Sequence, residues 1–427
     1  MKASLRWMVV TLLVVLSRSI LRKYRPLVVM VTGSVGKTST KDAIAAALGE
    51  RFYLRASEKS YNSEFGVPLT IIGASTPWND AIAWGRVIIE GFALLLFPNH
   101  YPKLLVLEVG ADKPGDMKKI LKIASPDVVV VTRLPEVPVH VEAYEGPAEV
   151  RAEEFAPAYA LAHGAALILS SEDVYARDMA RGIHASISFY GYGEDATVRI
   201  LNATCDIAGD EPGMRADILL EGKMHHIYAP GVLGEQQLYA PAAALAVADA
   251  LDMRITDALK GLKSYLPPPG RARLLRGKHD SILIDDTYNS SPAAVEEAIK
   301  SLELIKTGGR KVAILGDMLE LGRYSAAQHE RIGAFAAEHV DVLITVGTRA
   351  QAMATAFLNA GREEGTVEGY ENSVLAAAAL TNTIKEGDVV LIKGSQSVRM
   401  ERIVEALLAD EGDRGKLARQ EGEWKKR

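Results

Sequence analysis

Short runs of apolar, often β-branched residues alternate along the chain with longer segments rich in alanine, leucine, glutamate and lysine. Nearly continuous apolar runs are typical of strands whose two faces are both covered by helices. The alternation therefore predicts βαβ units and a parallel sheet, which places the protein in the α/β class. The predicted strands are residues 27–32, 104–109, 127–132 and 165–169, and then 281–285, 311–315, 342–346 and 389–393.

The pattern changes between about residues 184 and 230, where polar and apolar positions mix and glycine and aspartate interrupt them. This pattern predicts a small antiparallel sheet, inserted in or appended to the first domain. The run Pro267-Pro268-Pro269-Gly270 is the clearest linker, because proline continues neither a helix nor a central strand. We therefore predict an N-terminal helix in residues 1–25, a central domain in residues 26–267 and a C-terminal domain in residues 268–427.

Composition narrows the class of protein. The chain has 427 residues, of which 48% are hydrophobic and 24% charged, as in a soluble globular protein of two or three domains. A net charge of -5 argues against a nucleic-acid partner, which usually requires a basic face. The single cysteine, Cys205, cannot form an internal disulfide, and no cysteine or histidine spacing indicates zinc, which fits a reducing cytoplasm.

The N-terminus departs from this soluble pattern. Residues 7–17 carry no charge, but an uncharged stretch of this length falls short of the roughly 20 residues that a membrane-spanning helix needs. Three interpretations stay open: a helix docked on its own protein, a helix in the cytoplasmic membrane interface, and a true span. The interface is favoured, because cations crowd both sides and suit lipid head groups. The flanking cations are Lys2, Arg6, Arg18, Arg22, Lys23 and Arg25.

A glycine-rich loop carries the clearest chemistry. It follows a predicted strand and precedes a predicted helix over residues 39–48, the context that a phosphate loop requires. Lys37 would reach the β- and γ-phosphates of ATP, and the Thr38 hydroxyl would bind Mg²⁺; the alternative is a glycine turn with an incidental lysine. The spacing matches the short Gly-x-x-Gly-Lys-Thr form. The predicted phosphate-contacting residues are Gly33, Ser34, Val35, Gly36, Lys37, Thr38 and Ser39.

Glu108 ends another predicted strand. Because the C-terminal ends of parallel strands face the ligand crevice, a carboxylate there is well placed to hold Mg²⁺, which prefers oxygen ligands. After a phosphate loop, this position supports a second magnesium ligand.

Several further motifs follow in order, and together with the loop they resemble the Mur ligases of peptidoglycan synthesis. The resemblance covers residues 26 to about 408. The motifs are Tyr61-Asn62-Ser63-Glu64-Phe65-Gly66, Ala111-Asp112-Lys113-Pro114-Gly115, Gly270-Arg271, Asp285-Asp286-Thr287-Tyr288-Asn289, Leu315-Gly316-Asp317-Met318-Leu319-Glu320-Leu321-Gly322 and Lys393-Gly394-Ser395.

The resemblance implies a central ATPase domain, with the parallel sheet and the small antiparallel sheet, and a Rossmann-like C-terminal ligase domain that closes over the nucleotide. It implies that Lys37, Thr38 and Glu108 serve the phosphates and Mg²⁺, Asn289 adenine, Asp286 the ribose side and Arg271 the phosphates. Substrate contacts would come from Asn62, Asp317 and Lys393. Simpler roles stay open: a helix cap for Asp286, a solvated linker charge for Arg271, a surface lysine for Lys393 and a turn residue for Asp317.

Two departures from the family affect these expectations. A lysine carbamylated by CO₂ usually helps to bind a second Mg²⁺, but the matching position holds Glu154, with Glu153 as the rival in the alignment. A glutamate supplies a similar oxygen ligand, with His140 as its candidate partner; the alternatives are a solvated carboxylate and an ordinary loop histidine. The family also normally opens with a domain that grips UDP, and here the basic, apolar segment stands in its place.

The implied function is ATP-dependent amide-bond ligation, in which a muropeptide carboxylate, free or lipid-linked, is activated as an acyl phosphate and joined to an amine such as D-Ala-D-Ala. Two alternatives remain: a ligase with another acceptor, folylpolyglutamate-like or amidating, and an inactive membrane-associated scaffold. Residues 77–102, rich in aromatic and apolar residues, form either a core hairpin or a second membrane-facing or substrate-contacting surface. We expect a cytoplasmic enzyme at the inner face of the cell membrane, and the oligomeric state stays open.

Overall fold

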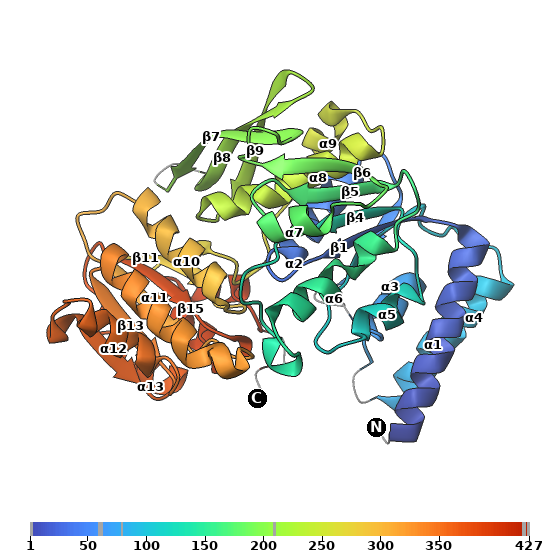
Figure 1. The fold of residues 1–427 in the computed structure, drawn as a ribbon. Coiled ribbons are helices and arrows are strands. Elements are labelled where there is room, and N and C mark those ends of the chain that lie inside the picture. The colour runs from blue at the N-terminus through green and yellow to red at the C-terminus, as the bar shows by residue number, and fades with distance from the viewer. Residues whose placement is uncertain (1–2, 59–62, 78–79, 208–210, 421–423, 425–427) are drawn as a thin grey trace.

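The computed structural model describes residues 3–58, 63–77, 80–207, 211–420 and 424, and they form two lobes, each built on one sheet (Figure 1). The first sheet has nine strands in the order β2-β3-β1-β4-β5-β6-β7-β8-β9, and the second has six in the order β10-β11-β15-β12-β13-β14. The first sheet consists of β1 (Leu27–Thr32), β2 (Leu54–Ala56), β3 (Leu104–Glu108), β4 (Val128–Val131), β5 (Ala166–Ser170), β6 (Ser186–Gly191), β7 (Val198–Asp206), β8 (Gly213–Leu220) and β9 (Lys223–Pro230). The second consists of β10 (Arg273–Arg276), β11 (Ile282–Asp286), β12 (Lys311–Gly316), β13 (Val342–Val346), β14 (Val367–Tyr370) and β15 (Val389–Lys393).

Helices cover both faces of each sheet. Side chains of α2, α8 and α9 pack on one face of the first sheet, and those of α1 and α3 to α7 pack on the other. On the second sheet, α10, α11 and α12 cover one face, and α13 and α14 cover the other. The helices are α1 (Ala3–Tyr24), α2 (Lys37–Leu48), α3 (Gly66–Ile72), α4 (Ala81–Leu96), α5 (Asp116–Leu121), α6 (Pro147–Tyr159), α7 (Val174–Met179), α8 (Tyr239–Ala250), α9 (Ile255–Leu262), α10 (Pro292–Ser301), α11 (Ser325–His339), α12 (Gln351–Asn359), α13 (Ser373–Leu380) and α14 (Glu401–Leu407).

The predicted α/β class is confirmed, because β1 to β6 pair in parallel and β11 to β15 do the same. The bounds of β1, β13 and β15 coincide with the predicted runs, since burial on both faces makes these strands almost wholly apolar. Three short strands, β2, β10 and β14, were not predicted. Each lies at or near a sheet edge, and their sequences are too short or too polar to give a periodic signal.

The antiparallel region continues the first sheet. Strands β7, β8 and β9 pair antiparallel with one another, and β7 also pairs in parallel with β6 through Tyr190 and Gly191. The antiparallel strands therefore extend one edge of the parallel sheet, as an appended rather than an inserted unit. The predicted region from about residue 184 begins too early, because β6 (Ser186–Gly191) pairs in parallel with β5 and β7.

The two sheets lie on either side of the proline run in the sequence: β9 ends before it, and β10 begins after it. The domain boundary at residue 267 stays a prediction. The residues after β1 and the last residue of β3, Glu108, line one cavity together with residues of the C-terminal lobe, so the phosphate loop opens toward that lobe.

Helix α1 packs against the protein through one face. Leu13, Leu16 and Ile20 are buried there, and the helix contacts α3 and α4. Within the described residues, none of the helices has both the length and the apolar character that a crossing of the bilayer requires.

Candidate active site

The phosphate loop joins the end of β1 to the start of α2. Gly33 has a φ of +118° and Gly36 one of +88°, the region that only glycine adopts without strain. A Cβ atom at position 33 would also lie 2.4 Å from Oγ1 of Thr132. The amide of Ser34 donates to the carbonyl of Arg133 at 2.8 Å, which fastens the loop to the residues after β4. The first amide groups of α2 thus lie beside the loop, where a helix N-terminus favours a phosphate.

The side chain of Glu154 on α6 accepts hydrogen bonds from the start of the phosphate loop. It is 2% exposed, and its Oε2 accepts hydrogen bonds from the Thr32 hydroxyl at 2.9 Å and from the Gly33 amide at 3.2 Å. Its Oε1 lies 3.8 Å from Nζ of Lys37, which itself donates to the Gly33 carbonyl. The rival, Glu153, accepts from the Met117 amide at the start of α5. Glu154 is therefore buried rather than solvated, and its predicted role as a metal ligand stays a prediction.

Thr38 and Glu108 lie together, as the magnesium prediction requires. The Thr38 hydroxyl donates to Oε1 of Glu108 at 3.2 Å, and Glu108 is 2% exposed. Its Oε2 is buried and has no hydrogen-bond partner among the described residues. A buried carboxylate oxygen that lacks a donor, next to a hydroxyl oxygen, is a donor set that suits a hard cation such as Mg²⁺.

Three cations surround Glu108. Burial raises the pKa of its carboxyl, while the charges of Lys41, Lys37 and Arg271 lower it. Lys41 was not singled out from the sequence, although it lies one helical turn after Lys37. Its Nζ is buried and donates to the Ser57 carbonyl at 2.7 Å. Because the charge of Lys41 acts on Glu108, it supports the ionised form of the proposed magnesium ligand.

His140 connects the two lobes instead of joining Glu108 and Glu154. Its Nδ1 lies 3.0 Å from Oε2 of Glu320 in the C-terminal lobe, and its Nε2 lies 3.6 Å from Oδ1 of Asp112. Burial lowers the pKa of His140, but the hydrogen bond and charge of Glu320 outweigh it, and the pKa is raised. Among the described residues, none of the groups of three or more histidine, cysteine or acidic side chains has a metal-binding arrangement. Glu320 belongs to a motif seen in the sequence, yet its contact with His140 requires the two lobes to be in place.

In the C-terminal lobe, Lys393 at the end of β15 joins this strand to the end of β11 through hydrogen bonds. Its Nζ donates to Oδ2 of Asp286 at 2.8 Å and to the carbonyl of Asn289 at 2.9 Å, and the residue is 3% exposed. Lys393 is thus no surface lysine. The second oxygen of Asp286 accepts from the Ala272 amide at 3.2 Å, next to Arg271, whose guanidinium lies 4.3 Å from the centre of the Tyr288 ring.

The loop borders two cavities. The larger, of about 440 Å³, brings together residues of both lobes around the Glu108 side of the loop. Its lining includes Ser34, Gly36, Lys37, Thr38, Glu108, His140, Arg271, Asn289, Glu320, Lys393 and Ser395. Cations from both lobes and the Glu108 carboxylate surround this cavity, a lining that suits phosphate groups bound together with a divalent cation.

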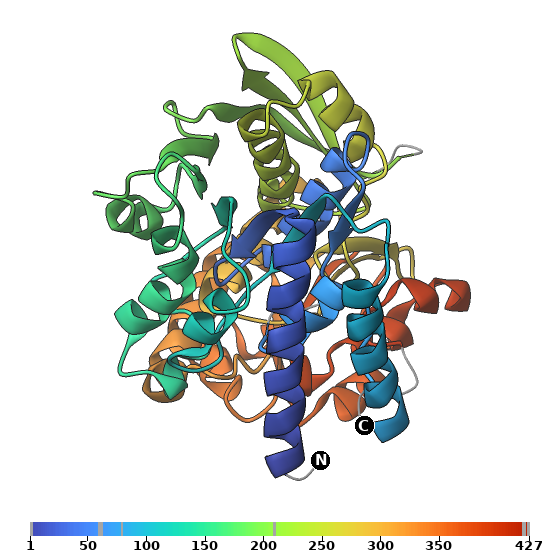
Figure 2. The ribbon, with the colours of Figure 1, turned by 90° about the vertical axis from the view of Figure 1, so that its right-hand side faces the viewer.

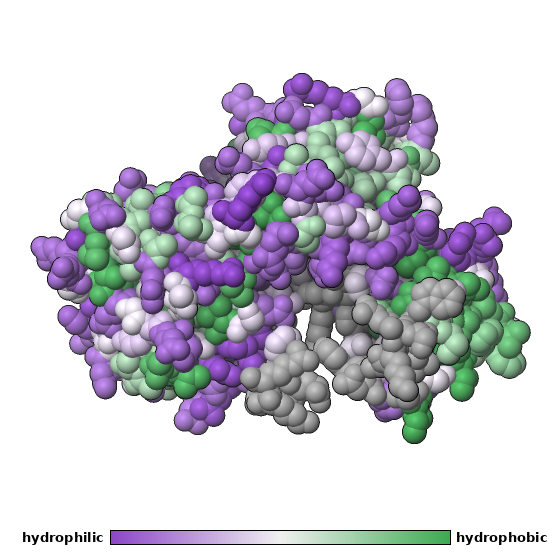
Figure 3. All heavy atoms as spheres, turned by 60° about the horizontal axis from the view of Figure 1, so that its bottom comes forward, coloured by the Kyte–Doolittle hydropathy of each residue, from purple (hydrophilic) through white to green (hydrophobic). Residues whose placement is uncertain are grey.

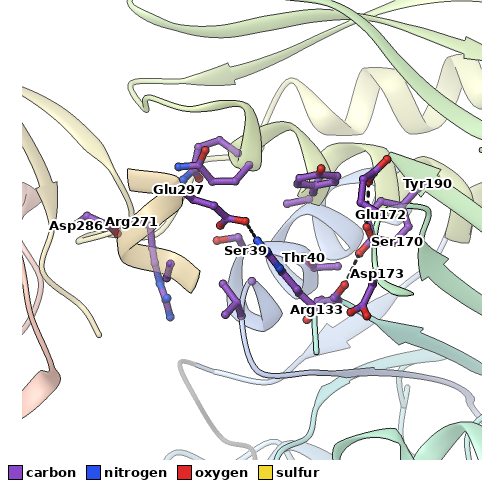
Figure 4. Close-up of a pocket in the computed structure, with 18 of the residues that line it drawn as sticks. Ser39, Thr40, Arg133, Ser170, Glu172, Asp173, Tyr190, Arg271, Asp286 and Glu297 are labelled. Atoms are coloured by element: carbon purple, nitrogen blue, oxygen red, sulfur yellow. Dashed lines mark hydrogen bonds and ion pairs between the residues drawn. The ribbon is translucent and has the colours of Figure 1, made fainter. Parts of the chain in front are cut away.

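The smaller cavity, of about 280 Å³, lies beside Val35, Ser39 and Thr40 at the start of α2. It combines the rings of Tyr190 and Tyr239 with amides and charges, a lining that suits a flat heterocycle with a ribose. Figure 4 shows Arg133 and Glu297 pointing toward each other across it, and they form an ion pair between the lobes. The lining residues that sequence reasoning did not identify include Arg133, Glu172, Gln236, Gln237, Tyr239 and Glu297.

These lining residues come from four separate segments, and only the polar pair Gln236-Gln237 before an alanine-rich helix gave a local signal. Asp286, Arg271 and Lys393 also line this smaller cavity, whereas Asn289 lines the larger one. The predicted contact of Asn289 with adenine stays a prediction.

Of the remaining predicted residues, Asp317 directly follows β12, and its carboxylate lies beside the residue that precedes α12. Its Oδ1 accepts from the Ala350 amide at 2.7 Å, and its carbonyl accepts from the Ser395 amide at 3.0 Å. It lines a third cavity, of about 610 Å³, at the C-terminal ends of β12, β13 and β14. Asn62 lies outside the described residues.

The two lobes, with a glycine-rich loop after the first strand and a second parallel sheet across the cavity from it, define a nucleotide-binding α/β protein of two domains. Residues 89–248 match the Mur ligase middle domain, and residues 270–396 match the Mur ligase glutamate ligase domain. The chain belongs to the Mur ligase family, and the predicted resemblance is confirmed.

Known ligases are similar to this protein over most of its chain. The UDP-N-acetylmuramoyl-tripeptide–D-alanyl-D-alanine ligase of Bacillus subtilis is 27% identical over 92% of this chain and 78% of its own length. The enzyme of the same name from Escherichia coli is 26% identical over 89% and 76%. The structure of MurF ligase from Thermotoga maritima in complex with ADP has a TM-score of 0.75 and 25% identity, and covers 93% of this chain and 83% of that one.

A folylpolyglutamate synthase from Mycobacterium tuberculosis, complexed with ADP, has a TM-score of 0.65 at 16% identity, with 93% and 94% covered, and shows the shared fold alone. Mur ligases are ATP-dependent amide ligases that form ADP. This chain is therefore an ATP-dependent C–N ligase that uses ATP and Mg²⁺.

Proposed function

We propose that this enzyme joins D-Ala-D-Ala to the terminal carboxylate of a muramoyl tripeptide in peptidoglycan precursor synthesis. The observation that carries the proposal is the larger cavity, where Lys37, Thr38 and Glu108 of the central lobe face Asn289, Glu320 and Lys393 of the C-terminal lobe. Relatives that match about nine tenths of this chain, and about three quarters of their own length, carry that activity in their names.

The reaction has two steps. A carboxylate oxygen of the acceptor attacks the γ-phosphorus of ATP, the bond to the β-phosphate oxygen breaks, and ADP leaves. The amine nitrogen then attacks the acyl carbon, phosphate leaves, and the nitrogen loses a proton. Both steps bring anions together, so cations must lower the repulsion between carboxylate and phosphates. Lys37 and Arg271 supply that charge from the two sides of the loop.

Bound Mg²⁺, held by Thr38 and Glu108, would neutralise phosphate charge. The charge of Lys41 lowers the pKa of Glu108 against the larger, opposite effect of burial. The pairs His140–Glu320 and Arg133–Glu297 join the two lobes over the cleft. Closure of this kind excludes water, which would otherwise hydrolyse the acyl phosphate. We assign Asp286 and Lys393 to the positioning of the residues around the nucleotide, because they pair with each other at the strand ends.

The third cavity suits the dipeptide. Arg399 and Arg402 offer guanidinium groups to its carboxylate, Asp317 and Glu371 offer charge to its ammonium group, and Val374 gives apolar contact to its methyl groups. Leu319 and Ser397 line both this cavity and the larger one, so the two cavities adjoin. An amine bound here would face the acyl phosphate.

The test is phosphate release by the purified protein with ATP, Mg²⁺, a muramoyl tripeptide and D-Ala-D-Ala. Release should require both substrates and should be lost in Lys37→Ala, while Lys260→Ala, which alters an exposed lysine far from the loop, should stay active. Release with a folate or ammonia acceptor but not with the tripeptide would replace this substrate assignment and keep the ligase. No release with any pair would support an inactive scaffold.

We also infer that the enzyme works in the cytoplasm and touches the inner face of the cell membrane through residues 1–25. The support is the row of cations at the end of α1, which suits anionic lipid head groups.

A further inference from the structure

Helices α1 and α4 form a firmly joined pair at the end of the molecule away from the C-terminal lobe (Figure 1, Figure 2). Nζ of Lys23 donates to the carbonyls of Leu94, Leu95 and Phe97 at 2.8, 2.9 and 3.1 Å, so it caps the C-terminus of α4 with a positive charge. The Tyr24 hydroxyl donates to the Leu94 carbonyl at 2.7 Å. The two helices therefore run in the same direction with their C-terminal ends together.

The inner faces of this pair are tightly packed. A Cβ atom at Gly91 on α4 would lie 2.9 Å from Cδ1 of Leu16 on α1, so glycine is what lets the helices come this close. Leu13 and Ile20 are buried on the same side of α1, and Trp84 and Val87 on α4. The pair is thus a fixed part of the fold and can present a surface of defined shape.

Its outer surface is apolar to an unusual degree. Ile82, Ile89 and Leu96 lie seven residues apart, which places them in one stripe along α4. On the face drawn in Figure 3, hydrophobic colour gathers at the end of the molecule where these helices lie. The exposed apolar side chains and their exposed fractions are Met8 55%, Val15 54%, Ile82 83%, Ile89 69%, Phe92 45%, Leu96 73% and Phe97 63%.

A basic cleft adjoins this apolar surface. It has a volume of about 570 Å³ and is lined by four cations, Arg18, Arg22, Arg25 and Lys122. Its one lining carboxylate, Asp127, already accepts a hydrogen bond from the Val28 amide at 2.8 Å. Several guanidinium groups around a hollow of this size suit a phosphate-bearing group.

The apolar and basic parts lie on the same stripe of α1. Met8, Val15 and Arg22 are seven residues apart and exposed, so the stripe changes from apolar to cationic toward the C-terminus of the helix. On α4, Arg86 and Glu90 are the exposed charged residues beside the apolar stripe. A surface with an apolar strip beside clustered cations matches the boundary of a bilayer, where acyl chains lie under anionic head groups.

We propose that the α1–α4 surface docks on an anionic lipid bilayer, with Ile89 and Leu96 entering the head-group boundary and lipid phosphates held by Arg18, Arg22 and Arg25. The proposal deepens the membrane contact inferred above for residues 1–25 and does not depend on the substrate assignment. A second copy of the chain is the less fitting occupant, because a symmetric contact would bring the same cations into one interface.

Co-sedimentation of the full chain with vesicles tests the proposal, since it needs neither ATP nor substrate. Binding to vesicles of phosphatidylcholine with phosphatidylglycerol should exceed binding to phosphatidylcholine alone. Arg18→Gln/Arg22→Gln/Arg25→Gln should weaken it on the order of 100-fold, at about fivefold for each cation lost. Ile89→Ser/Leu96→Ser should weaken binding to the same vesicles and should leave the residual binding sensitive to salt.

Two matched controls separate this surface from a general effect. Arg181→Gln/Arg254→Gln/Lys306→Gln removes three exposed cations elsewhere, and Val174→Ser/Leu266→Ser removes two apolar side chains that are 63% and 70% exposed. Both controls should bind as the unchanged protein does. Equal binding to the two kinds of vesicle, or equal loss in the controls, overturns the proposal.

Binding to neither vesicle, combined with a dimer that Ile89→Ser/Leu96→Ser dissolves, would assign the surface to a second copy. Inorganic phosphate that protects Arg18 and Arg22 from modification without any vesicle binding would assign the cleft to a soluble phosphate and would equally overturn docking. Because phosphate release is measured in solution, failure of docking leaves the proposed ligation intact.

Discussion

The phosphate loop and residues 285–289 occupy equivalent places, each at the end of a central parallel strand, but they are held in different ways. The loop is shaped mainly by its own glycines and by the amide of Ser34. The C-terminal segment is held by side chains from far along the chain, Lys393 at 107 positions from Asp286 and Arg419 at 132 positions from Thr287. A locally determined element can be recognised from a short motif, whereas the other can be understood only once the lobe has folded.

The largest effect is expected from substitutions in the phosphate loop, the element that its own local sequence shapes. Gly33→Ala combines a φ of +118° with a Cβ atom 2.4 Å from Thr132, so the loop must shift and kcat/KM for ATP should fall on the order of 100-fold or more. Gly36→Ala has a φ of +88° but no atom nearer than 3.9 Å, so it adds strain of about 1–2 kcal/mol without a clash. Steady-state phosphate release measures both. Equal losses in the two variants would contradict the role of Thr132 in shaping the loop.

The next largest effect is expected from Arg419, which holds the segment of residues 285–289 from far along the chain. Arg419 is 6% exposed and donates to the carbonyls of Thr287 and Tyr288 and to Glu401. Arg419→Ala leaves Glu401 with a buried charge and fewer partners, so the free energy of unfolding in urea should fall by about 3–5 kcal/mol, and KM for ATP should rise. Arg419→Lys keeps the charge with fewer donors and should recover part of the loss. A change under about 1 kcal/mol in Arg419→Ala would show that the segment holds itself.

A third effect is expected on the pH dependence of unfolding, and it comes from the buried carboxyl of Asp285 in the same segment. Burial raises its pKa to about 6 from 3.8, although Thr287 donates to it. A raised pKa in the folded state means that the protonated form stabilises the fold; this contribution is complete below about pH 4 and is lost as the pH rises through about 6. Asp285→Asn should remove it, which changes the pH dependence of unfolding between pH 4 and 6 by up to about 3 kcal/mol. Identical pH profiles in the two proteins would mean that Asp285 does not titrate in this range.

The sequence predicted the α/β class, most strands and the loop, because each of these has a local pattern of apolar residues or glycines. Its place at the end of a buried strand also identified Glu108 as a site residue, whereas Asp286 and Lys393 were identified only through the resemblance to the Mur ligases. The sequence did not identify Lys41, Arg133, Gln236 or Arg419, whose importance depends on contacts between segments that only the folded chain brings together. Burial likewise had no local signal, so Lys393 and Glu154 could not be distinguished from solvated charges.

Glu154 sharpens the comparison, because it is a residue distant in sequence whose side chain accepts hydrogen bonds at the phosphate loop. Two roles make different predictions: a carboxylate that stands in for a carbamylated lysine binds Mg²⁺, while a carboxylate that accepts from Thr32 and Gly33 shapes the loop. Since both donors contact its Oε2 and its Oε1 lies near Lys37, we expect the second role.

Glu154→Gln keeps an acceptor oxygen for Thr32 and Gly33 but removes the charge near Lys37, so KM for ATP should change only about two- to fivefold, within the range of an ion pair that is worth about 1 kcal/mol. Glu154→Ala removes the acceptor and should cost about 1–3 kcal/mol of stability, because two buried donors lose their partner. The decisive measurement is the Mg²⁺ concentration for half-maximal phosphate release at saturating ATP. This concentration should stay within about twofold of that of the unchanged enzyme in Glu154→Gln and in the control Glu153→Gln, because neither residue would contact the ion. A rise of tenfold or more in Glu154→Gln alone would instead make Glu154 a metal ligand. Loss of a charged oxygen ligand weakens cation binding by at least that factor.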